Sequence, residues 1–175
     1  MANREALREL QTRLASRLQA ARTEGSSVAS WLAVESAGNL YLLPLAQAGE
    51  IFPWVSVQAV PYTQRWFLGV ANLRGALVGV VDLAGLMGSA GSRSEQALSE
   101  SSLLALNAAL EVNAALLVDR LAGLRGTDAF VSSEPPPEDA PRFFGTTYID
   151  SSGIRWQELN LQILSQHPDF LSISA

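Results

Sequence analysis

One arginine stands alone inside the most apolar part of the chain. Arg74 interrupts the run from Phe67 to Leu83, which reads FLGVANLRGALVGVVDL, and Asn72 and Asp82 are its only other strongly polar residues. A guanidinium in such surroundings must reach water, pair with a carboxylate or be offered to a partner. The planar fork of N–H donors on arginine suits a structural ion pair as well as recognition of a partner. A structural role and a binding role for Arg74 therefore both stay open at this point.

Residues that could support catalysis are few. His167, in the tetrad QHPD, is the only histidine, and no G-x-S-x-G serine elbow accompanies it. Asp82 and Asp119 each follow an apolar strand; paired carboxylates can do acid–base work, but single aspartates at strand ends more often cap turns. The chain has no cysteine and no lysine, which excludes thiolate metal sites, thiol catalysis, Schiff-base chemistry and the lysine of a P-loop. The sequence therefore predicts no catalytic residue, no cofactor site and no metal site.

Composition limits the class of protein further. With 175 residues, 48% of them apolar, the chain is long enough for one domain with a sizeable core or for two small fused domains. The net charge of −5 opposes nucleic-acid binding, which usually needs a basic face. The longest apolar stretch, Leu103–Val118, is interrupted by polar residues, so no membrane span is expected. The charged N-terminus lacks the apolar core of a signal peptide, so the expected compartment is the cytoplasm.

Residues 3 to 22 carry the pattern of an amphipathic helix. Leu7, Leu10, Leu14 and Leu18 recur at spacings of three, four and four, which places them on one stripe. The breaker cluster TEGSS, Thr23–Ser27, then ends the helix. The leucines could rest on the surface of the domain itself or enter a partner's groove. A membrane-surface helix is a third possibility, but the interspersed glutamates weaken attraction to anionic lipid.

From Val28 onward the pattern changes to many short strands. The turn tetrad SAGN at 36–39 predicts a hairpin, residues 88–101 read as a mobile surface loop, and Asn160 caps a short helix that Pro168 stops. Many short strands with few helices indicate barrels or a sandwich. The expected strands are Trp31–Glu35, Leu40–Leu45, Glu50–Val60 with a break at Pro53, the two halves of Phe67–Leu83, Leu103–Asn107, Val112–Val118, one near Phe130, Phe144–Asp150 and Ile154–Glu158.

The order of these motifs resembles the CheW-like adaptor domain family. The segment GVANLRG, followed by an apolar strand that ends in Asp-Leu, is similar to the signature of that family. LYLLPLAQAGEI, AVP, AALLVDRLAGL and FFGTTYI resemble its other segments in the right order, from about Val28 to Leu171. The sequence departs from the family at Gly79, where proline is frequent. Within the family, the helical N-terminal extension and the ending QHPDFLSISA are most similar to adaptors of type IV pilus chemotaxis-like systems.

The resemblance implies a mainly β fold. Two small five-stranded SH3-like β-barrels would share a hydrophobic seam, with an N-terminal amphipathic helix and a short C-terminal helix. The expected organisation is a helical extension at 1–27, a CheW-like domain at 28–171 and a tail at 172–175. Within the domain, the division between the two barrels is expected near 88–101.

The resemblance also implies a function without catalysis. The chain would be a scaffold that couples the cytoplasmic tip of a chemoreceptor to the regulatory domain of a CheA-like histidine kinase. A type IV pilus system that drives twitching motility is expected, with a flagellar chemotaxis array as the alternative. The protein would be recruited through receptors to the inner face of the cytoplasmic membrane, with no membrane insertion and no nucleic acid bound. A small oligonucleotide-binding barrel and an uncharacterised hydrolase are weaker hypotheses, since the chain lacks lysine and any nucleophile–base pair.

The expected partner-binding residues surround the Arg-Gly step. In the resembling family the arginine that matches Arg74 bears on receptor binding, and the glutamate that matches Glu50 is its ion-pair partner. Gly75 would supply the turn, and Asn72 lies beside it. Trp54 and Trp66 flank polar or turn residues and are the aromatic candidates for a partner face, although core packing is the commonest use of such rings.

Overall fold

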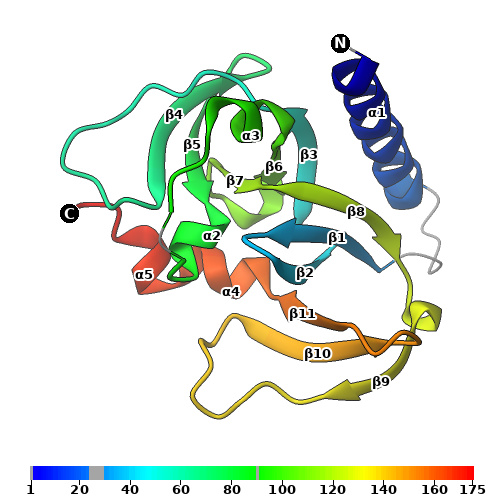
Figure 1. Ribbon diagram of the computed structural model, residues 1–175. Coiled ribbons are helices and arrows are strands. Elements are labelled where there is room, and N and C mark those ends of the chain that lie inside the picture. Colours follow the sequence, from blue (N-terminus) through cyan, green and yellow to red (C-terminus); the bar gives the residue numbers. More distant parts are fainter. Residues whose placement is uncertain (1, 24–29, 90) are drawn as a thin grey trace.

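The computed structural model describes residues 2–23, 30–89 and 91–175, which form two β-sheets with few helices (Figure 1). One sheet has six strands in the order β8-β1-β2-β11-β10-β9, and the other has five in the order β3-β6-β7-β5-β4. The chain starts the first sheet, leaves it to build the whole second sheet, and then returns to complete the first. The strands of the first sheet are β1 Trp31–Ser36, β2 Asn39–Pro44, β8 Arg120–Arg125, β9 Phe130–Glu134, β10 Phe144–Asp150 and β11 Arg155–Leu159. The strands of the second are β3 Ala48–Pro53, β4 Phe67–Leu73, β5 Ala76–Asp82, β6 Ser102–Leu106 and β7 Ala114–Val118.

This interleaving corrects the expected division of the domain. No boundary lies near 88–101, because β5 before that segment and β7 after it pair directly as parallel neighbours in one sheet. The five-strand expectation holds for the second sheet, whereas the first has six strands. β8, which starts immediately after Asp119, had not been predicted because its sequence RLAGLR has no clear alternation.

The two sheets share one hydrophobic core. Strand β7 is buried along its whole length because it has apolar neighbours on both faces. Ala114, Leu116 and Val118 point into a cluster that also holds side chains of β1, β2 and β11, whereas Ala115 and Leu117 point into a second cluster within their own sheet. The first cluster is the seam between the sheets, in agreement with the expected architecture.

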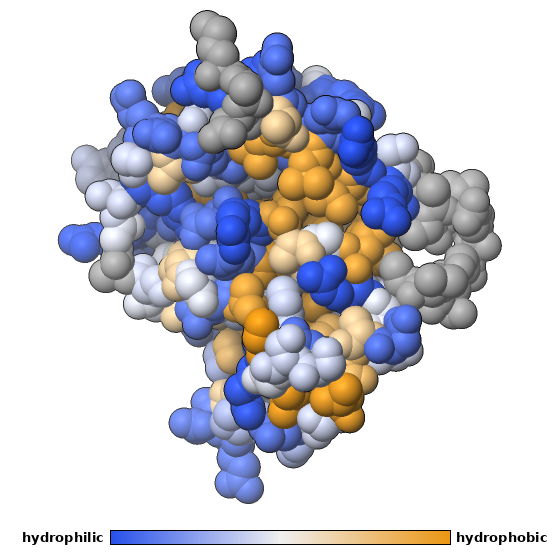
Figure 2. Space-filling model, turned by 45° about the vertical axis from the view of Figure 1, so that its right-hand side comes forward, coloured by the Kyte–Doolittle hydropathy of each residue, from blue (hydrophilic) through white to orange (hydrophobic). Residues whose placement is uncertain are grey.

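Helix α1, Ala2–Thr23, packs against this seam through the C-terminal half of its leucine stripe. Leu14 and Leu18 are 6% and 2% exposed and belong to the shared core, and Gln11 donates a hydrogen bond of 2.7 Å to the hydroxyl of Ser102. Leu10 remains 46% exposed. Figure 2 shows a patch of hydrophobic atoms, framed by hydrophilic residues, on the face of the molecule that is turned toward the viewer. The interpretation that the stripe rests on the domain itself is therefore confirmed for Leu14 and Leu18. The expected boundary between the helical extension and the CheW-like domain, at 27/28, lies outside the described residues.

Two further corrections concern segments without regular strand pairing. The strand expected over Glu50–Val60 ends at Pro53, and residues 54–66 form an irregular connection, because proline has no N–H to continue the ladder. The loop expected at 88–101 contains the helix α3, Glu95–Glu100. Its N-cap is Ser94, whose hydroxyl accepts a hydrogen bond from the N–H of Ala97, a serine cap that had been missed. A single helical turn, α2, Leu83–Leu86, precedes this segment.

The C-terminal segment is part of the domain. Helix α4, Leu161–Gln166, begins after the predicted Asn160 cap. Pro168 does not end the helical segment but opens a second short helix, α5, Pro168–Leu171, since proline suits a first helical position. The expected tail at 172–175 contacts the domain, because Ser174 forms an antiparallel bridge with Thr63.

Candidate partner-binding groove

Arg74 lies at the tip of the β4–β5 hairpin in an unusual backbone conformation. Leu73 pairs with Ala76, so the loop has two residues, and both have positive φ, +52° for Arg74 and +82° for Gly75. These angles define a type I′ turn, in which the first position favours asparagine, aspartate or glycine. The side-chain oxygen of Asn72 accepts a hydrogen bond of 2.9 Å from the N–H of Gly75 and supports the turn. An arginine here is strained, which points to a role for its side chain.

The guanidinium of Arg74 pairs with Glu50, as the resemblance implied. Its Nη2 atom lies 2.5 Å from Oε1 of Glu50, and the two side chains are 76% and 39% exposed. Glu50 belongs to β3 and Arg74 follows β4, the strands at the two opposite edges of the five-stranded sheet. The contact therefore shows that this sheet curls until its edges approach each other, as a barrel does.

Beside this ion pair the surface is hollowed into a groove of about 440 Å³. Its floor is mostly apolar, and the charged pair lies at the rim. Residues that line it come from β3, from the β4–β5 hairpin, and from β6, β7 and the segment that joins them. They include Phe52, Val78, Leu106, Val112 and Ala114, with Glu50 and Arg74. An apolar floor with few polar groups at the edge is typical of a surface that receives a partner's side chains.

The glycine that departs from the family pattern has a local explanation. The N–H of Gly79 donates a hydrogen bond of 3.0 Å to the carbonyl of Asn113, which proline could not do. A Cβ at Gly79 would lie 3.0 Å from the ring of Phe67. Strand β5 runs without a break through this position.

The two tryptophans do not share the groove with Arg74. Trp54 is half-buried against the apolar cluster inside the five-stranded sheet. Trp66 is half-buried at the shared core, where its ring stacks on Phe170 with centroids 6.5 Å apart. The structure thus brings together Glu50, Asn72, Arg74 and Gly75 and places both aromatic candidates elsewhere. Their role in partner binding stays a prediction.

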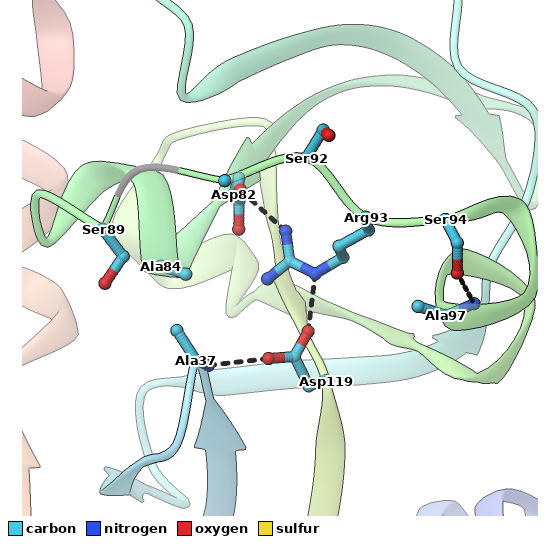
Figure 3. Close-up of a pocket in the computed structure, with 10 residues that line it drawn as sticks. Ala37, Asp82, Ala84, Ser89, Ser92, Arg93, Ser94, Ala97 and Asp119 are labelled. Atoms are coloured by element: carbon cyan, nitrogen blue, oxygen red, sulfur yellow. Dashed lines mark hydrogen bonds and ion pairs between the residues drawn. The ribbon is translucent and has the colours of Figure 1, made fainter.

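A second arginine cluster, which sequence reasoning missed, lies between the two sheets (Figure 3). Arg93 points into a pocket of about 360 Å³ and is held from both sides by carboxylates. Its Nη1 atom lies 2.7 Å from Oδ2 of Asp82, and its Nε donates to Oδ1 of Asp119 at 2.5 Å. Burial lowers the pKa of Arg93, but the hydrogen bonds to Asp82 and Asp119 outweigh it, so that the pKa lies above its ordinary value.

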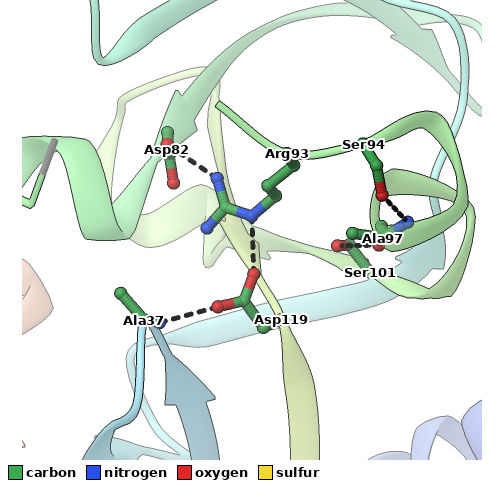
Figure 4. Close-up of polar contacts among 7 residues, drawn as sticks. All are labelled: Ala37, Asp82, Arg93, Ser94, Ala97, Ser101 and Asp119. Atoms are coloured by element: carbon green, nitrogen blue, oxygen red, sulfur yellow. Dashed lines mark hydrogen bonds and ion pairs between the residues drawn. The ribbon is translucent and has the colours of Figure 1, made fainter. Parts of the chain in front are cut away.

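The Arg93 cluster joins parts of the chain that belong to different sheets (Figure 4). Asp82 ends β5 of the five-stranded sheet, whereas Asp119 stands at the passage from β7 to β8. The other carboxylate oxygen of Asp119 accepts a hydrogen bond of 2.6 Å from the N–H of Ala37, at the tip of the β1–β2 hairpin of the six-stranded sheet. Asp119 therefore does cap a turn, as expected for such residues, but a turn more than 80 residues away in sequence. The spacing of the three charges offered no local signal for this cluster.

His167 occupies the helix-end position expected for it. It follows α4 and precedes α5, and its Nδ1 atom accepts a hydrogen bond of 3.2 Å from the N–H of Asp169. Its ring lies perpendicular to that of Phe143, with the ring centroids 5.2 Å apart. Across the described ranges, no group of three or more histidine or acidic side chains is placed to hold a metal ion. Nor is any described helix long and apolar enough to cross a bilayer.

Comparison with known proteins identifies the family. The CheW-like domain family matches residues 30–167, which is most of the chain, and the protein belongs to this family. The class defined by the two sheets and the groove is thus the CheW-like adaptor, built from two SH3-like β-barrel-type subdomains.

Two relatives describe this membership in more detail. Protein PilI of Pseudomonas aeruginosa is 29% identical over 154 residues, which cover 85% of this chain and 83% of PilI. The crystal structure of the scaffolding protein TtCheW from Thermoanaerobacter tengcongensis superimposes with a TM-score of 0.66 at 20% identity, over 83% of this chain and 97% of TtCheW. The fold of the chain is therefore that of a CheW scaffold.

Proposed function

We propose that this protein is a non-catalytic adaptor that holds a chemoreceptor and a CheA-like histidine kinase together. The groove beside Arg74 would receive the cytoplasmic tip of the receptor, and another face would bind the regulatory domain of the kinase. The similarity to PilI over most of both chains favours a type IV pilus system, and thus control of twitching motility, over a flagellar array. Recruitment through the receptor would bring the protein to the inner face of the cytoplasmic membrane.

The observation that carries this proposal is the strained arginine over an apolar groove. A type I′ turn with asparagine or glycine in place of Arg74 would fold with less strain. The ion pair with Glu50 does not offset that strain by itself, because pairs this exposed contribute about 0–1 kcal/mol to stability. A side chain kept in a costly position without a matching gain in stability is best explained by contact with a partner.

The charge distribution supports a protein partner over a nucleic acid. The chain carries 12 basic and 17 acidic residues, and a groove for oligonucleotides would need an excess of basic groups along its rim. Here the rim has one arginine, and that arginine is already paired with a glutamate. An apolar helix face with a few polar groups fits such a groove better.

Binding of both partners at once is the test. Purified full-length protein is mixed with a receptor fragment that contains the cytoplasmic tip and with the isolated regulatory domain of the kinase. Size-exclusion chromatography with light scattering should show a ternary complex, and calorimetry should give a Kd for each partner separately. If the protein binds neither fragment, or if the two fragments compete for one site, the adaptor function is wrong.

A further inference from the structure

The most exposed large apolar side chain in the described part of the molecule has no role in the groove. Tyr62 is 89% exposed, and Val60 and Pro61 before it are also exposed. We call Val60–Pro61–Tyr62 the tyrosine tip. It lies in the irregular connection between β3 and β4. An aromatic side chain left in water forgoes the stabilisation that its burial would bring, so this exposure needs a reason.

The backbone at Tyr62 is strained as well. Its φ is +60°, a left-handed conformation that is an outlier for a bulky residue. Three other non-glycine residues among those described share a positive φ. Two of them, Ala37 and Arg74, stand before a glycine in two-residue hairpin turns, and Glu111 ends a short 3₁₀ helix. Tyr62 instead follows Pro61 in a turn over residues 60–63, in which Oγ1 of Thr63 donates a hydrogen bond of 2.8 Å to the carbonyl of Val60. Proline followed by a residue with positive φ is typical of a type II turn, whose second central position favours glycine or asparagine. The turn therefore accounts for the backbone conformation but not for a tyrosine at this position.

Distant residues hold the strained conformation in place. The N–H of Ala175 donates a hydrogen bond of 2.9 Å to the carbonyl of Tyr62. The N–H and side-chain amide of Gln64 donate to the carbonyls of Ile173 and Ser174 at 2.7 and 2.9 Å. Together with the Thr63–Ser174 bridge, these bonds clamp the connection against the C-terminal segment. The clamp fixes the backbone but leaves the ring of Tyr62 in solvent, so its effect is to present the ring.

The tyrosine tip precedes β4 and Arg74 follows it in the β4–β5 turn, so the two lie toward opposite ends of that strand. Strand β4 has seven residues, and an extended strand rises roughly 3.3 Å per residue, so on the order of 20 Å separates its two ends. A partner seated beside Arg74 therefore leaves the tip accessible. An adaptor that joins two proteins needs two such separated surfaces.

We propose that the tyrosine tip anchors the second partner, the regulatory domain of the kinase. This inference rests on the proposed function, since it assigns the face that the adaptor uses while the receptor occupies the groove. The ring of Tyr62 would enter an apolar pocket on the kinase domain, and its hydroxyl would donate to an acceptor at the rim. Tyrosine is well suited to this role, because it buries a large ring at low entropic cost and is enriched among interface hot spots.

The test replaces Tyr62 by asparagine, which tolerates the left-handed conformation and removes the ring. Tyr62→Asn should unfold at the same temperature as the wild type or higher, bind the receptor fragment within twofold, and bind the kinase domain at least tenfold more weakly. Val131→Asn is the matched control, because Val131 is 70% exposed but lies on β9 of the other sheet. Its binding of both partners should stay within twofold of the wild type. If Tyr62→Asn proves unstable, Tyr62→Gly provides the same comparison, since glycine adopts this conformation freely.

The outcomes separate this inference from the function on which it rests. If the wild type binds both partners and Tyr62→Asn binds the kinase domain as well as the wild type does, the tip is not the anchor. Loss of both partners in a folded Tyr62→Asn protein overturns the inference too, because the two surfaces would then not be independent. If the wild type binds neither partner, the adaptor function itself is refuted.

Discussion

Arg74 and Arg93 are both held by carboxylates, but their surroundings differ. The side chain of Arg74 is 76% exposed and pairs with one glutamate at the rim of a groove, whereas that of Arg93 is 14% exposed and lies between two aspartates. A pair in water is screened and contributes little to the fold, but a buried charge that loses its partner is costly. Exposure therefore indicates which arginine is available to a partner and which one secures the structure.

The two arginines also differ in what they join. Arg74 and Glu50 bring together the edge strands of a single sheet. Arg93 connects the end of β5, through Asp119, to the tip of the β1–β2 hairpin in the other sheet. The first contact shapes a surface, and the second fixes how two sheets lie relative to each other.

The largest effect is expected from removing the buried cation. Arg93→Met leaves Asp82, whose side chain is 10% exposed, without its counter-charge, and loss of one partner of a buried pair costs about 3–5 kcal/mol. Urea denaturation at neutral pH should show this loss. The double variant Arg93→Met, Asp82→Asn should regain part of it, because the uncompensated charge is then gone. A loss below about 1 kcal/mol for Arg93→Met would mean that the cluster behaves like a surface pair.

A selective effect on binding is expected at the exposed arginine. Arg74→Ala should weaken receptor binding by about 2 kcal/mol or more, because arginines at the centre of interfaces are frequent hot spots. Its stability should change by only about 0–1 kcal/mol. Calorimetric titration with the receptor fragment and with the kinase domain measures the first effect, and kinase binding should be unchanged. Arg155→Ala, which removes an exposed pair with Glu134 in the other sheet, is the matched control. Gross unfolding with equal loss of both partners would show that Arg74 is structural.

A smaller effect separates the strain of the turn from the function of its side chain. Arg74→Asn should be more stable than Arg74→Ala by roughly 0.5–1 kcal/mol, since asparagine suits the first position of a type I′ turn and alanine does not. Both variants should lose receptor binding to the same extent. Thermal and urea unfolding compare the two stabilities. If Arg74→Asn keeps receptor binding, the turn rather than the guanidinium is recognised.

The smallest effect is expected for Asp150, whose carboxylate accepts hydrogen bonds from uncharged donors. Hydrogen bonds from the indole N–H of Trp156 and the N–H groups of Ile154 and Ser152 lower the pKa of Asp150 from its ordinary 3.8. A lowered pKa in the folded state stabilises the protein above the unfolded pKa and loses this contribution as the pH falls through the folded value. The free energy of unfolding of the wild type relative to that of Asp150→Asn should thus be constant near neutral pH and should fall below about pH 4. Urea denaturation at a series of pH values from neutral down to 2 measures this difference in unfolding free energy. A difference that stayed constant down to pH 2 would contradict the prediction.

Much of the local structure could be predicted because neighbouring residues determine it. The SAGN and Arg-Gly turns, the leucine stripe of α1 and the Asn160 cap of α4 depend on contacts within a few positions. The pair between Arg74 and Glu50 was expected from the family signature, and the structure contains it. Trp54 and Trp66 were expected at a partner face because they flank polar or turn residues in sequence, and that local clue says nothing about which face a ring reaches.

The sequence by itself thus determined the β class, the turns, the absence of thiol and lysine chemistry and the residues of the groove's ion pair. Only the tertiary structure decided how the two sheets share the chain, where Arg93 finds its aspartates and why Tyr62 is held exposed. Asp119 meets Ala37 across 82 positions, and Gln64 meets Ser174 across 110. The physical reason is the range of the interactions. Turns and caps are satisfied within a few residues, whereas a buried charge or a strained loop is satisfied by whichever distant segment the packed core brings beside it.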